Sequence, residues 1–161
     1  MSYIQQVMTE AALRQLSQQA AGVVRRRQNL NWHPQLTDPV QRMFNALEPG
    51  TYVRPHRHNW SDGWELFLLV AGEAILLTFD ERGRVVDRYQ LGHETLAVEI
   101  APAAWHTIAA CCSGTVFFEC KRGPYRPNPP EDMAVWSPDE GDPDCRLMEQ
   151  WFHTAKQGDR F

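Results

Sequence analysis

Between Val40 and Arg122 the chain is a close succession of short β-type runs separated by turn residues, and this pattern constrains the fold most strongly. Turn signals such as Pro49-Gly50, Ala71-Gly72 and the stretch 80–83 punctuate the runs, and no helical pattern interrupts them. The predicted strands cover residues 40–47, 52–58, 64–70, 74–79, 85–91, 96–100, 106–110 and 115–121. Short strands at this spacing predict an all-β antiparallel sandwich or barrel.

Different patterns flank this region. Residues 9–21 are predicted to form a helix, with Thr9 as its cap and Leu13, Leu16 and Ala20 at helical spacing. The segment 29–39 reads as a loop or arm, and the proline-rich stretch after residue 123 reads as an irregular surface strap that ends in a short helix over 144–155. We therefore expect an N-terminal helical extension over 1–28, a barrel domain over 29–140 and a C-terminal tail over 141–161.

Composition excludes several classes of function. A chain of 161 residues fits one domain with its own core, and a net charge of -4 provides no basic surface for nucleic acid. No apolar run is long enough to cross a membrane, and the N-terminus lacks the apolar core of a signal peptide. The four cysteines lack a Cys-x-x-Cys spacing. We expect a cytoplasmic protein with neither a nucleic-acid nor a membrane partner.

His56 and His58 are the most informative pair for function. Residues two apart in an extended strand point to the same face, so both imidazoles can reach one point in space. Glu65 from the next strand and His106 from a later one would complete a shell of three nitrogens and one oxygen. Such a shell suits one divalent transition metal with open positions for water or substrate, and iron, zinc, nickel, cobalt and manganese all remain candidates.

The same residues carry a resemblance. Gly50, five residues and His56-x-His58, then Glu65, six residues and Gly72, resembles the first conserved motif of the cupin superfamily, and residues 102–106 resemble the second. Over roughly residues 25 to 140 the chain looks more closely like the WbuC family of cupin-fold metalloproteins. The residues that carry this second resemblance are Gln41-Arg42, Pro55-His56-Arg57-His58, Phe79-Asp80, Trp105-His106, Glu119-x-Lys121-x-Gly123-Pro124-Tyr125 and Trp136-x-Pro138-x-Glu140.

The resemblance implies a cupin double-stranded β-helix, or jelly-roll barrel, with His56, His58, Glu65 and His106 as metal ligands. Polar residues that could line the barrel mouth form a second group. Of these we expect Glu119, Lys121 and Tyr125 to be catalytic candidates and Arg42 and Asn45 to be substrate-binding candidates. The alternative for Glu119 and Lys121 is an ordinary ion pair on the rim of a strand.

Three functions remain open because the cupin fold hosts many chemistries. The WbuC family takes its name from surface-polysaccharide gene clusters, so the leading prediction is a metal-dependent protein that binds or converts a sugar-like small molecule, such as a sugar isomerase. A non-haem iron dioxygenase and a non-enzymatic metal- or ligand-binding module are the alternatives. Cupins are commonly dimers, and a homodimer is expected here.

Overall fold

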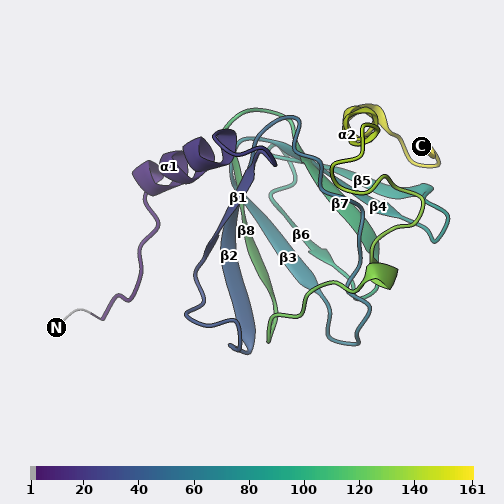
Figure 1. The fold of residues 1–161 in the computed structure, drawn as a ribbon. Helices are drawn as coiled ribbons and strands as arrows, with labels where there is room; N and C mark the ends of the chain where they lie inside the picture. Colours follow the sequence, from purple (N-terminus) through teal and green to yellow (C-terminus); the bar gives the residue numbers. More distant parts are fainter. Residues whose placement is uncertain (1–2) are drawn as a thin grey trace.

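The computed structural model describes residues 3–161, and its strands form two antiparallel sheets that face each other (Figure 1). One sheet has the order β1-β2-β8-β3-β6, formed by Arg27–Asn31, Val40–Leu47, Thr115–Arg122, Glu65–Ala71 and Ala97–Ile100. The other has the order β5-β4-β7, formed by Val85–Leu91, Ala74–Phe79 and Trp105–Ala110. The predicted all-β jelly-roll barrel is confirmed, and the two sheets enclose its interior.

Alternation along each strand separates the barrel interior from the outer faces of the sheets. Ile108 and Ala110 of β7 belong to the interior cluster, whereas Trp105 and Ala109 belong to a cluster on the outside. The interior cluster is completed by Leu47, Phe67, Ala74, Leu76, Leu91, Ile100 and Phe117. Because it occupies only part of the barrel, the rest of the interior is free for polar side chains.

Helix α1 (Glu10–Ala21) covers the outer face of the five-stranded sheet. Its N-cap Thr9 accepts a hydrogen bond from the Ala12 amide at 3.2 Å, which satisfies one of the free donors of the first turn. Leu16 and Ala20 are buried against Phe44, Ala46 and Val116, the outward-facing residues of β2 and β8. The predicted helix therefore covers one outer side of the barrel.

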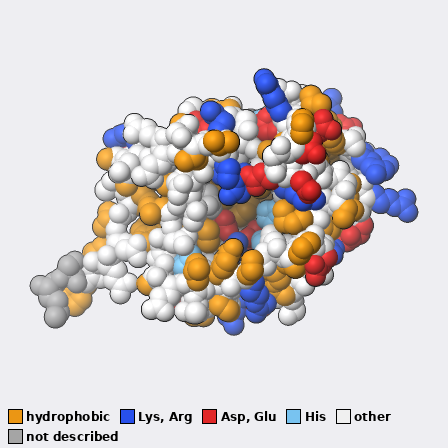
Figure 2. All heavy atoms as spheres, in the orientation of Figure 1, with side chains coloured by type: hydrophobic (Ala, Val, Ile, Leu, Met, Phe, Trp, Pro, Cys, Tyr) orange, Lys and Arg blue, Asp and Glu red, His pale blue; other side chains and the backbone are white. Residues whose placement is uncertain are grey.

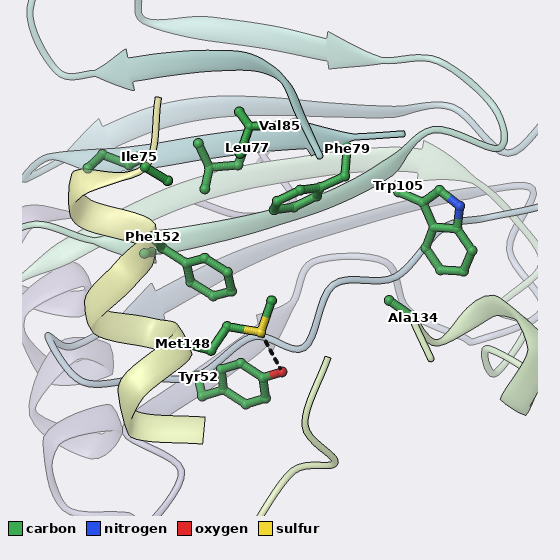
Figure 3. Packing of buried hydrophobic residues seen from close by; sticks show 11 residues of the cluster. Tyr52, Ile75, Leu77, Phe79, Val85, Trp105, Ala134, Met148 and Phe152 are labelled. Carbon is green, nitrogen blue, oxygen red and sulfur yellow. Dashed lines mark hydrogen bonds between the residues drawn. The ribbon is translucent and has the colours of Figure 1, made fainter. Parts of the chain in front are cut away.

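Helix α2 (Cys145–Thr154) covers the outer face of the three-stranded sheet, together with the strap that precedes it (Figure 3). Met148 and Phe152 are fully buried and project from α2 onto Ile75, Leu77 and Phe79. The Tyr52 ring stacks on Phe152 with centroids 6.1 Å apart. A short 3-10 helix, Pro130–Asp132, lies in the strap. The C-terminal segment thus contributes to the core of the protein.

Two local predictions are wrong. Residues 29–31, predicted as part of a loop, belong to β1; the strand escapes detection because its inner face meets a polar cavity, so the sequence lacks apolar alternation. Residues 52–58, predicted as a strand, form an irregular segment with a single bridging residue, His56. Pro55 has no N–H to donate to a neighbouring strand, which explains the interruption.

Glu48 connects α1 to the barrel through hydrogen bonds. Its replacement by glutamine should lower the free energy of unfolding by about 1.5–3 kcal/mol at pH 7, the range for hydrogen bonds to a charged group. The buried carboxylate accepts hydrogen bonds from Ser17 of α1, Ser113 and the Gly114 amide. Burial alone would raise the pKa of Glu48, but the bonds from Ser113, Ser17 and Gly114 hold it below its usual range. Urea denaturation of wild type and Glu48→Gln measures the difference.

The pH dependence of that difference follows from the depressed pKa. Since the folded pKa lies below the unfolded one, the contribution of Glu48 is present above about pH 4.3 and is lost as the pH falls through the folded pKa. The exposed Glu94 provides a matched control, and Glu94→Gln should change stability by less than about 0.5 kcal/mol. A difference between wild type and Glu48→Gln that grows on acidification would contradict the assignment.

Within residues 3–161 no helix is long and apolar enough to cross a membrane.

Candidate metal centre

The backbone itself brings two of the predicted ligands together. His56 and His106 form an antiparallel bridge in which each amide donates to the other residue's carbonyl, at 3.1 and 2.9 Å. Residues paired in this way lie directly opposite each other, and the two imidazole centroids are 4.4 Å apart. His58, two residues after His56, places its ring 5.8 Å from that of His106. The spacing argument for the two histidines therefore holds even though residues 52–58 are not a continuous strand.

Glu65 enters from the opposite sheet as the first residue of β3. Its carboxylate is 2% exposed and lies 2.7 Å from His58 Nε2 and 3.0 Å from His106 Nε2. Ligand atoms of the four residues His56, His58, Glu65 and His106 all lie within 4.8 Å of one another. The structure thus places the four predicted ligands in one cluster inside the barrel.

Unsatisfied polar atoms show what this cluster is suited to hold. His58 Nε2, His106 Nε2 and Glu65 Oε2 are buried and have no hydrogen-bond partner among the described residues. The short histidine–glutamate contacts lack the N–H···O geometry of a hydrogen bond, so these atoms converge without satisfying one another. Buried polar atoms without partners are costly, and a cation at their common focus removes that cost. The residues fit a divalent transition metal.

Backbone carbonyls orient two of the imidazoles. Nδ1 of His56 lies 3.0 Å from the Arg54 carbonyl, and Nδ1 of His106 lies 2.9 Å from the Ala104 carbonyl. A proton on Nδ1 leaves Nε2 as the free lone pair, the arrangement usual for metal-binding histidines. Burial, followed by the neighbouring His106, lowers the pKa of His56 to about 3. His56 is therefore neutral at physiological pH, as a metal ligand must be.

A second polar group lies beside the ligands. Lys121 is opposite Glu65 in the β3–β8 register, and its Nζ lies 2.8 Å from Glu65 and 2.7 Å from Glu119. Asn45 donates to Glu119 at 2.8 Å. Burial and the nearby Glu65 raise the pKa of Glu119 against the opposing effect of Lys121. Glu119 and Lys121 are therefore more than an ion pair on the rim of a strand, because Lys121 also contacts Glu65 of the ligand cluster inside the barrel.

The cluster opens into a cavity of about 470 Å³. Figure 2 shows a hollow in one face of the molecule, with histidine and acidic side chains inside it and arginine or lysine beside it. Its wall contains His56, Glu65, His106, Asn45, Glu119 and Lys121, and also Arg25, Arg27, Gln28 and Asn29. Sequence reasoning missed these last four residues because they stand in a segment without a recognisable strand pattern.

Two other candidates lie elsewhere. Arg42 is an exposed residue of β2 that alternates with the cavity-lining Met43 and Asn45, so its side chain is on the outer face. Tyr125 is 50% exposed and follows the cis peptide bond between Gly123 and Pro124. Neither residue lines the cavity.

The side chain of Arg57 fixes the position of the segment that carries His56 and His58. Arg57→Ala should therefore lower metal affinity by about 10-fold or more, the effect typical of groups that orient metal ligands. Its Nε pairs with the buried Asp132 at 2.9 Å, and its guanidinium lies 4.4 Å from the Trp105 ring centroid. Competition with a fluorescent zinc chelator measures the affinity. Arg82→Ala, at an exposed turn, serves as the control, and equal affinities of the two variants would contradict the role assigned to Arg57.

A family model described as a domain of unknown function (DUF6016) matches residues 8–91. No curated protein matches the sequence.

Three solved structures are similar to this chain. A cupin 2 domain-containing protein from Halorhodospira halophila is 25% identical, with 83% of each chain covered and a TM-score of 0.48. A cupin superfamily protein from Desulfitobacterium hafniense is 20% identical over 59% of this chain and 77% of its own, with a TM-score of 0.45. A protein from Shewanella oneidensis is 13% identical over 61% of this chain and 68% of its own, with a TM-score of 0.51. Of these three, the Shewanella oneidensis structure alone has a TM-score above 0.5, and at 13% identity that likeness concerns the fold alone. The WbuC resemblance stays a prediction.

Proposed function

The chain belongs to the family of the domain of unknown function DUF6016, and from its cavity we propose that it is a cupin that holds one divalent transition metal and binds or converts a sugar-like small molecule. The observation that carries the proposal is the convergence of buried ligand atoms of His58, Glu65 and His106 that have no hydrogen-bond partner within residues 3–161. A bound ion would supply Lewis-acid polarisation of a carbonyl or hydroxyl, or of water. The role in surface-polysaccharide synthesis rests on the WbuC resemblance.

The chain's own residues supply the remaining chemistry in this proposal. Glu119, whose pKa is raised by burial and by Glu65, holds a proton more readily than an ordinary glutamate and is the candidate proton donor and acceptor. Lys121 contacts both Glu119 and Glu65 and so positions the two carboxylates relative to each other. Asn45 holds Glu119 through its amide and faces the ligand space. A non-enzymatic binding module would not require such a group beside the metal.

Metal analysis of untagged protein, purified without a nickel column, tests the proposal. About one equivalent of a divalent transition metal per chain is expected, and its removal by a chelator should lower the melting temperature, because an ion that binds only the folded state stabilises that state. Metal-free protein that gains no stability from zinc, iron, nickel, cobalt or manganese would overturn the proposal. Oxygen uptake by iron-loaded protein would identify the dioxygenase alternative.

We also propose that the protein forms a homodimer. β1 lies at one edge of the five-stranded sheet, and an edge strand has backbone groups available for pairing with another chain. Light scattering after size-exclusion chromatography distinguishes a dimer from a monomer. The cytoplasmic location stays a prediction from the sequence.

A further inference from the structure

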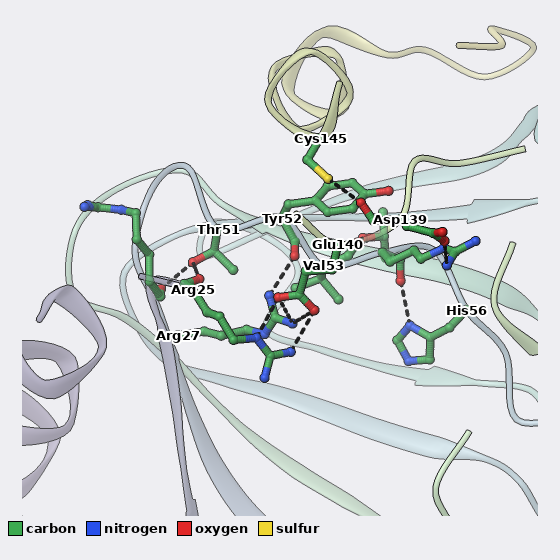
Figure 4. A network of polar contacts seen from close by, with 12 residues as sticks. Arg25, Arg27, Thr51, Tyr52, Val53, His56, Asp139, Glu140 and Cys145 are labelled. Atoms are coloured by element: carbon green, nitrogen blue, oxygen red, sulfur yellow. Dashed lines mark hydrogen bonds and ion pairs between the residues drawn. The ribbon is translucent and has the colours of Figure 1, made fainter. Parts of the chain in front are cut away.

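A clasp of Arg25, Arg27 and Glu140 lies beside the cavity (Figure 4). Arg25 reaches the Glu140 carboxylate through Nε at 2.6 Å and Nη2 at 2.9 Å, and Arg27 reaches both carboxylate oxygens through Nη2 at 3.0 Å. Arg27 Nη1 also donates to the Tyr52 carbonyl at 2.7 Å. Two guanidinium groups share one carboxylate, so the clasp has one positive charge in excess.

Arg27 belongs to the inner face of the barrel. In the β1–β2 register it lies opposite Leu47, a member of the interior cluster, and it lines the same cavity as His56, Glu65 and Lys121. Its side chain is only 20% exposed. Glu140 and Tyr52 hold the guanidinium in place, and a guanidinium fixed in this way is pre-organised to bind a carboxylate.

Charge counting indicates the sign of the ligand. Arg25, Arg27 and Lys121 balance Glu65, Glu119 and Glu140, which leaves this group neutral. A divalent ion would then add two positive charges to the cavity. A concave site with net charge of one sign favours a ligand that carries the opposite sign.

Amide side chains indicate the rest of the ligand. Asn29 and Asn45, which are opposite each other in the β1–β2 register, line the cavity. Asn45 uses its NH2 group to bind Glu119, and Asn29 uses its own to bind Asn31 at 2.7 Å. Among the described residues, this leaves the amide oxygen and one N–H of both Asn29 and Asn45 free, and hydroxyl groups, which donate and accept, are complementary to them.

We propose that the ligand is a polyhydroxylated carboxylate, whose acid group binds Arg27 of the clasp and whose hydroxyls face the cavity amides and the metal centre. The inference rests on the proposed function, and it narrows the substrate class from sugar-like molecules to sugar acids. Arg27 is thereby a specificity-determining residue that touches the ligand.

Matched acid and neutral probes test the inference by isothermal titration calorimetry on zinc-loaded protein of verified metal content. D-glucuronate is compared with D-glucose, and D-gluconate with D-glucitol. At least one acid should bind about 10-fold or more tightly than its neutral partner, as expected for a charge-assisted hydrogen bond. Arg27→Gln should abolish this preference, whereas Arg14→Gln, which removes the same charge from an exposed position on α1, should keep it.

The Glu140→Gln variant distinguishes a role of Arg27 in ligand binding from a purely structural role of the clasp. Loss of the internal counter-charge should leave the acid bound at least as tightly as in wild type. Equal affinity for acids and neutral probes, absence of binding by both acids, a preference that survives in Arg27→Gln, or a loss in Glu140→Gln equal to that in Arg27→Gln would each overturn the inference. Because zinc content and zinc-dependent stability are measured on the same samples, failure of the inference is distinguishable from failure of the metal centre.

Discussion

Replacing His106 by alanine should lower the metal affinity of the protein by more than about 100-fold, because loss of even an outer partner of a metal ligand costs about 10- to 100-fold. His106 is 1% exposed, and its Nε2 is one of the buried side-chain atoms that have no hydrogen-bond partner among the described residues. Metal content after purification without a nickel column, followed by competition with a fluorescent zinc chelator, provides the measurement.

His93→Ala is the matched control for His106→Ala. The side chain of His93 is 60% exposed and pairs with Glu73 at 3.4 Å, away from the ligand cluster. Wild-type metal content is expected in this variant. Retention of full affinity by His106→Ala would remove His106 from the ligand set and leave the cluster without its link to the three-stranded sheet.

Phe152→Ala should destabilise the protein by about 3–5 kcal/mol, the usual cost of deleting a buried phenyl ring. Phe152 is 0% exposed and stacks on Tyr52, while Met148 beside it is buried equally well. For a chain of this length the melting temperature should fall by about 6–20 °C. Urea denaturation and thermal unfolding, followed by circular dichroism, measure both quantities.

Leu147→Ala provides the control on the same helix, since Leu147 is 57% exposed. It should cost less than about 0.5–1 kcal/mol, close to the usual effect of a surface substitution. If Phe152→Ala were no more destabilising than Leu147→Ala, α2 would not be part of the cooperative core, and residues 145–154 would act as a separable tail.

Local patterns made much of the fold predictable. The strands at 40–47, 74–79 and 85–91 have the predicted bounds, because apolar alternation and turn residues act over a few positions. The helix α1 was equally readable from its cap and its spacing. The sequence could not reveal β1, because a strand that faces a polar cavity has no apolar alternation, and it misread residues 52–58, where Pro55 prevents continuous pairing.

The residues of the candidate site also divide into those that could be identified from the sequence and those that could not. His56, His58, Glu65 and His106 were recognisable because their chemistry and spacing are unusual. Arg42 and Tyr125 looked equally suitable as polar residues near the motifs, yet strand alternation and the course of the strap place them away from the cavity. Arg27 stood in a basic run that reads as a solvated surface, and only its pairing with β2 turns it inward.

Periodicity and residue chemistry are local properties of the chain, and they were sufficient to predict the all-β barrel and the metal-ligand candidates. The other polar groups of the cavity come together only when the chain packs. Glu140 meets Arg25 and Arg27 across more than a hundred residues, and Lys121 meets Glu65 through strand register. Contacts of that kind depend on how the sheets and the strap pack together, which no short-range pattern encodes.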